Sequence, residues 1–86
     1  MTKKHFDKIA KDINERALVI FHSEESSYTE KWYGLFTLYH LINDLCSSFS
    51  QFNENFSAGT FIKACGVNKL KLELEREQAT RIATGI

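Results

Sequence analysis

Apolar residues in the first quarter of the chain recur at steps of three and four, which is the repeat of an amphipathic helix. Charged residues such as Lys8 and Asp12 fall on the opposite side of that helix. Thr2 offers a cap at its start, and the polar residues 23–27 end it. The pattern therefore predicts a helix over residues 3–22. Its apolar positions are Phe6, Ile9, Ala10, Ile13, Ala17, Ile20 and Phe21.

A second helix is predicted over residues 28–49, because Ser27 and Glu30 have the spacing of a capping box. Its apolar residues fill an arc of about 220° around the axis. An arc this wide touches more than one neighbour, so the helix is either central in a bundle or shares part of its face with another chain, as in a homodimer. These residues are Tyr28, Trp32, Leu35, Leu38, Tyr39, Leu41, Ile42, Leu45, Cys46 and Phe49.

A short third helix is predicted over residues 57–65, where Ser57 offers an N-cap and Gly66 a left-handed stop. The apolar positions Phe61, Ile62 and Cys65 would face inward. In the polar segment before this helix, Phe52 and Phe56 are expected to anchor the connecting loop.

The last segment is ambiguous, because Leu70, Leu72 and Leu74 alternate like a strand while the surrounding residues are strong helix formers. Opposite charges four residues apart, such as Lys71 and Glu75, favour a helix over residues 69–83. A strand or a disordered tail stays open as an alternative. The sequence thus predicts a single all-α domain over residues 1–86, a small bundle of three to four helices.

Charge argues against a nucleic-acid binding protein, because eleven basic residues are balanced by eleven acidic ones. A local cluster of lysines in the first helix is the one candidate for a phosphate contact. Acidic residues interleave with these lysines, which is typical of a solvated helix face. The cluster consists of Lys3, Lys4, Lys8 and Lys11.

No motif with catalytic, metal-binding or cofactor-binding spacing is found in the sequence. Cys46 and Cys65 are nineteen positions apart and lack a CxxC or paired-histidine pattern, which fits a reduced setting. Ser47, His40 and Asp44 share a helical face, but no nucleophile turn accompanies them. Apolar runs stay far below the roughly 20 residues of a membrane span. We therefore expect a soluble protein that is not an enzyme and holds no metal or cofactor.

Four aromatic residues gather near the start of the second helix, in a composition common both to small cores and to binding hot spots. Core packing and a partner-binding surface are both consistent with them. Tyr33 is the best contact candidate, because it projects away from the apolar arc. The four are Tyr28, Trp32, Tyr33 and Tyr39.

The opening MTKKHFDKIAKDI and the later NENFSAGTFIKACGV together resemble a group of small bacteriophage and prophage accessory proteins. These often begin with Met-Thr-Lys-Lys and an aromatic residue, and close with Asn, an aromatic residue, a helix and Ala-Cys-Gly before Val or Leu. The chain departs from this pattern by having no proline, by lacking an Asp before the short helix, by carrying Thr60 where Arg is usual, and by extending beyond Val67. The matching positions are Met1 to Lys4, Phe6, Ile9, Ala10, Asn55, Phe56, Phe61, Ala64, Cys65, Gly66 and Val67.

The resemblance implies a setting rather than a chemistry. It predicts a phage protein in the host bacterial cytoplasm that binds a host protein and inhibits or modulates it, as anti-CRISPR proteins of similar size do. The alternative is a small regulator that contacts nucleic acid through the four lysines of the first helix.

Overall fold

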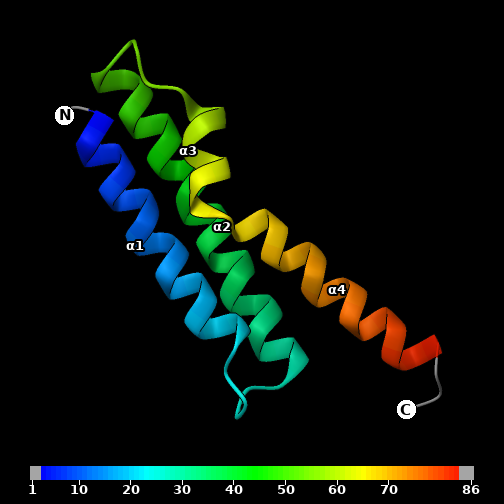
Figure 1. Ribbon diagram of the computed structural model, residues 1–86. Coiled ribbons are helices and arrows are strands. Elements are labelled where there is room, and N and C mark those ends of the chain that lie inside the picture. Colours follow the sequence, from blue (N-terminus) through cyan, green and yellow to red (C-terminus); the bar gives the residue numbers. More distant parts are fainter. Residues whose placement is uncertain (1–2, 84–86) are drawn as a thin grey trace.

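The computed structural model describes residues 3–83 as four helices joined by short turns (Figure 1). The described residues contain no strand, so the predicted all-α bundle is confirmed. Thr2, the predicted first cap, lies outside them. The helices are α1 (Lys3–Phe21), α2 (Tyr28–Phe52), α3 (Ala58–Cys65) and α4 (Val67–Ala83).

The first two helices form an antiparallel hairpin, on which the two shorter helices pack (Figure 1). Helix α3 lies mainly against α1, and α4 lies mainly against α2. Towards its carboxyl end α4 diverges from the hairpin (Figure 1). The molecule is consequently elongated, with extents of 50 × 20 × 16 Å.

All four helices contribute to one apolar core. Two of the α1 positions in it are alanines, Ala10 and Ala17, which let neighbouring helices come close to the α1 backbone. Gly34 of α2 serves the same purpose, because a Cβ atom there would lie only 3.1 Å from Cγ2 of Ile20. The buried residues are Phe6, Ala10, Ile13, Ala17, Leu35, Ile42, Cys46, Phe61, Cys65, Val67, Leu70 and Leu74.

Helix α2 begins at the predicted capping box. The Ser27 hydroxyl accepts from the Glu30 amide at 3.2 Å, and the Glu30 carboxylate accepts from the Ser27 amide at 3.3 Å. The helix runs to Phe52, three residues beyond the predicted end. Ser50 and Gln51 are polar, but both lie within the helix. Asn53 ends it in an extended conformation, and its side-chain oxygen accepts from the Asn55 amide at 2.9 Å.

The expectation that both Phe52 and Phe56 anchor the loop before α3 holds for only one of them. Phe56 is half-buried against the core, as predicted, but Phe52 is 87% exposed and anchors nothing within its own chain. The prediction for Phe52 was wrong because the extra helical turn carries its side chain outward before the Asn53 turn redirects the backbone.

Gly66 joins α3 directly to α4. Ser57 caps α3 as predicted, accepting from the Thr60 amide at 3.3 Å. Gly66 is left-handed, with φ of 70°, and its carbonyl then accepts from the Leu70 amide at 3.3 Å. Helix α4 therefore begins at Val67, two residues earlier than predicted, and no linker separates the two helices.

Burial resolves the ambiguity of the last segment in favour of a helix. Leu70 and Leu74, four residues apart, are 6% and 3% exposed, whereas Leu72 between them is 46% exposed. A strand would place all three on one face, so the pattern of burial follows the helical repeat.

Candidate interaction surface

A row of aromatic rings covers one side of α2. Trp32 and Phe36 stack at 4.8 Å between centroids with an interplanar angle of 14°. His40 continues the row, edge-on to Phe36 at 4.4 Å, and also contacts Tyr39 at 5.5 Å. Tyr33 stands edge-on to Trp32 at 5.4 Å. Trp32, Phe36 and His40 are spaced four residues apart, so one helical turn separates each ring of the row from the next.

Lys71 of α4 lies over this row. Its ammonium nitrogen is 4.7 Å from the ring centroid of Tyr39, 5.4 Å from that of Phe36 and 5.7 Å from that of Trp32. All three distances are within the range of a cation–π interaction. We call these six residues the α2–α4 aromatic surface: Trp32, Tyr33, Phe36, Tyr39, His40 and Lys71.

The members of this surface differ in exposure. Trp32 and Tyr39 are half-buried and pack one side against the core, so core packing explains part of their environment. Phe36 is also half-buried. Tyr33 is 60% exposed and projects into solvent, as predicted from its place outside the apolar arc.

The structure brings together three of the four aromatic residues selected from the sequence. Tyr28 packs against the core and lines a separate hollow with Lys31, Leu74 and Arg81. Sequence reasoning missed Phe36, His40 and Lys71. The spacing of Trp32 and Phe36 was a usable local signal, but the approach of Lys71 depends on how α4 crosses α2.

The four lysines of the first helix are all exposed along α1. Lys8 pairs with Asp12 one turn later, and this hydrogen bond raises the pKa of Lys8. Lys3 lines a hollow near the start of the helix. The acidic partner of Lys8 is the interleaved residue expected of a solvated face.

Both cysteines are buried in the core with free thiols. Burial raises the pKa of Cys65 to about 11, with a smaller contribution from the nearby Cys46, and burial also raises the pKa of Cys46. Both thiols are therefore protonated near neutral pH, which is the state of inert core residues. Within residues 3–83, no group of three or more histidine, cysteine or acidic side chains is placed to hold a metal ion.

Comparison of the chain with protein-family models, with curated proteins and with solved structures gave no match. Over the part of the chain that the structure describes, none of the helices combines the length and apolar character needed to cross a bilayer.

Proposed function

We propose that this chain is a non-enzymatic protein that binds a host protein through the α2–α4 aromatic surface and thereby inhibits or modulates it, as a phage accessory protein would. The observation that carries the proposal is the exposure of Tyr33 beside three half-buried rings. Tyrosine and tryptophan at the centre of a contact contribute disproportionately to affinity. Phage origin and the host bacterial cytoplasm follow from the resemblance alone.

The contacts within the surface favour binding without rearrangement. The Trp32 and Phe36 rings are already stacked, and Lys71 holds them from the opposite helix. Rings fixed before association lose little conformational entropy when a partner covers them. The partner expected from this chemistry presents apolar side chains to Tyr33 and Phe36, and a carboxylate to Lys71.

The test is affinity capture with three immobilised baits, using a lysate of the bacterium in which the gene occurs. The first bait is the wild-type chain and the second is Tyr33→Ser, which removes the exposed ring. The third is Val19→Ser, a matched control on α1, because Val19 is 61% exposed and lies outside the aromatic surface. Quantitative mass spectrometry compares the proteins that each bait retains.

The proposal expects one protein to be retained equally by the wild-type and Val19→Ser baits and about 10-fold or more weakly by Tyr33→Ser, as for a hot-spot residue. Equal retention by all three baits would place the contact elsewhere on the chain. If the wild-type bait retains no protein specifically, the proposal fails.

A further inference from the structure

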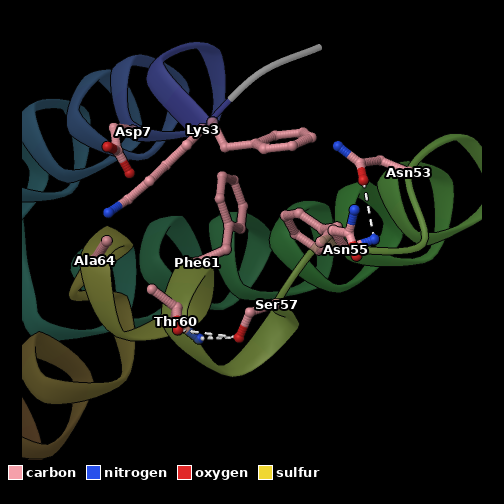
Figure 2. A pocket seen from close by; sticks show the side chains of 10 residues that line it. Lys3, Asp7, Asn53, Asn55, Ser57, Thr60, Phe61 and Ala64 are labelled. Carbon is pink, nitrogen blue, oxygen red and sulfur yellow. Dashed lines mark hydrogen bonds between the residues drawn. The ribbon is translucent and has the colours of Figure 1, made fainter.

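A second hollow lies away from the α2–α4 aromatic surface, between the start of α1, the loop before α3 and α3 itself (Figure 2). Its volume is about 350 Å³, which is within the usual range of sites for small molecules. Lys3 and Asp7 of α1 line one side, Asn53 and Asn55 of the loop line the other, and the Phe61 ring lies between them (Figure 2). We call it the α1–α3 hollow.

The floor of the α1–α3 hollow is aromatic but largely covered. Phe6 and Phe61 are only 9% and 3% exposed, so the half-buried Phe56 is the most accessible of the three rings. The Phe56 ring is fixed by tilted contacts with Phe6 at 4.8 Å and with Phe61 at 5.6 Å. A ligand can therefore lay an apolar group on this floor but cannot bury it between the rings. The polar side chains around the floor must decide which ligand fits.

Two opposite charges beside the floor, Lys3 and Asp7, are both exposed and form no ion pair or hydrogen bond with any residue that the structure describes. They are four positions apart on α1, which is a spacing at which a lysine and an aspartate can pair. Lys8 and Asp12 have the same order and the same spacing on the same helix, and they do pair. The two charges at the α1–α3 hollow thus stay apart although the helix permits their pairing.

We propose that the α1–α3 hollow binds a free apolar amino acid. The carboxylate of the ligand accepts from the Lys3 ammonium, its ammonium donates to the Asp7 carboxylate, and its side chain lies on the Phe56 ring. A single carbon joins the two charged groups of an amino acid, which suits two side chains whose Cβ atoms are about 5–6 Å apart on neighbouring helical turns. A ligand with only one charge would satisfy only one of the two residues.

The size of the hollow and its floor favour an aromatic side chain on the ligand. A cavity of about 150 Å³ is enough to hold benzene, so the α1–α3 hollow has room for a phenyl ring together with the two charged groups. This ring can meet Phe56 in the tilted or edge-on contact that aromatic rings prefer. The side-chain amide of Asn55, which has no hydrogen-bond partner among residues 3–83, is a further donor for the ligand's carboxylate.

Binding should be weak, because the charges are exposed and the floor offers little ring surface. We expect a dissociation constant of about 0.5–5 mM for L-phenylalanine, a ligand of about a dozen heavy atoms. The α1–α3 hollow shares no residue with the α2–α4 aromatic surface, so this binding is independent of the proposed function and its test needs no protein partner.

The probe is L-phenylalanine, added to the isotope-labelled chain at up to about 20 mM, several times the highest expected dissociation constant. The amide resonances of Asn55, Thr60 and Phe61 should shift along one saturating curve, while that of Tyr33 stays in place. Hydrocinnamate lacks the ammonium and L-phenylalanine methyl ester lacks the carboxylate, so each should bind about 2- to 5-fold more weakly. Glycine keeps both charges but lacks the side chain, and it should bind more weakly than L-phenylalanine.

Two variants, Lys3→Gln and Asp7→Asn, each remove one charge from an exposed position, so the fold does not depend on them. Lys8→Gln and Asp12→Asn are the matched controls, because that pair lies outside the hollow. The first two variants should bind L-phenylalanine about 2- to 5-fold more weakly, whereas the controls should bind it like the wild type. Lys3→Gln should not change the affinity for the methyl ester, and Asp7→Asn should not change that for hydrocinnamate.

Three results would overturn the proposal. L-phenylalanine could shift no resonance of the hollow at the highest concentration, or glycine could bind as tightly as L-phenylalanine. Equal losses of affinity in Lys3→Gln and Lys8→Gln would also overturn it, because they would assign the effect to the general charge of α1 rather than to the hollow.

Discussion

The substitution Gly66→Ala tests the junction between α3 and α4. Gly66 has a φ of 70°, and a Cβ atom there would lie 2.6 Å from the side-chain nitrogen of Asn14. That nitrogen donates to the carbonyl of Cys65 at 3.0 Å, at the last residue of α3. An added methyl group would therefore strain the backbone and also displace the side chain that caps α3.

The expected loss in the free energy of unfolding is about 2–4 kcal/mol. The left-handed conformation costs alanine roughly 1–2 kcal/mol. Leaving a part-buried carbonyl without its donor costs a further 1–3 kcal/mol or so, and the lower entropy of the unfolded alanine chain offsets about 0.5 kcal/mol. A domain of this length has a total stability of roughly 4–13 kcal/mol, so the effect is large.

Urea unfolding followed by circular dichroism measures the change, with Gly59→Ala as the matched control. A Cβ atom at Gly59 meets nothing within 4 Å, so that variant should gain about 0.4–1 kcal/mol. In an Asn14→Ala background both the steric conflict and the Asn14 hydrogen bond are absent, so Gly66→Ala should cost about 1–3 kcal/mol less than in the wild type. Equal costs in both backgrounds, or a cost below about 0.5 kcal/mol in the wild type, would refute the reasoning.

Two further predictions concern Cys65 and Lys71. Because burial raises the pKa of Cys65 from 9.0 to about 11, its thiol keeps its proton in the folded chain at a pH where the unfolded chain loses it. The free energy of unfolding of the wild-type chain should therefore fall as the pH rises from 9 to 11, by at most about 3 kcal/mol more than that of Cys65→Ala. Parallel pH profiles of the wild type and Cys65→Ala would contradict this. Lys71→Met keeps the apolar stem but removes the charge above the rings, so it should lose about 0.5–2 kcal/mol in urea unfolding, while Lys71→Arg should lose less. Identical unfolding midpoints for Lys71→Met and wild type would show that the ammonium contributes no stability.

The helices could be predicted because their boundaries depend on residues close together in the chain. The Ser27 and Glu30 box, the Ser57 cap and the Gly66 stop each act within one helical turn, and all three are present in the structure. The end of α2 was misjudged for a related reason. Polar Gln51 interrupts the apolar pattern, but the backbone leaves the helical conformation only at Asn53, whose side-chain oxygen accepts from the Asn55 amide.

The candidate surfaces could be predicted only in part, because they depend on how helices meet. Tyr33 was recognised from its position outside the apolar arc, a local property of α2. The place of Lys71 over the rings of Trp32 and Tyr39 depends on the packing of α4 against α2. The contact between the rings of Phe6 and Phe56, fifty residues apart, likewise depends on how α1 packs against the loop before α3. Neither arrangement has a signature in residue spacing.

The distribution of aromatic residues gives the strongest reason to look for partners. The chain has seven Phe, three Tyr and one Trp, yet only Phe6 and Phe61 among them are buried. A small domain leaves many rings half-buried for geometric reasons alone, so Trp32 or Phe56 would not be informative by itself. Phe52 and Tyr33 are different, because they are mostly exposed while aliphatic, alanine and cysteine side chains fill most of the core. Their rings bury little surface within the chain, so they are the aromatic residues whose presence the packing of this chain explains least.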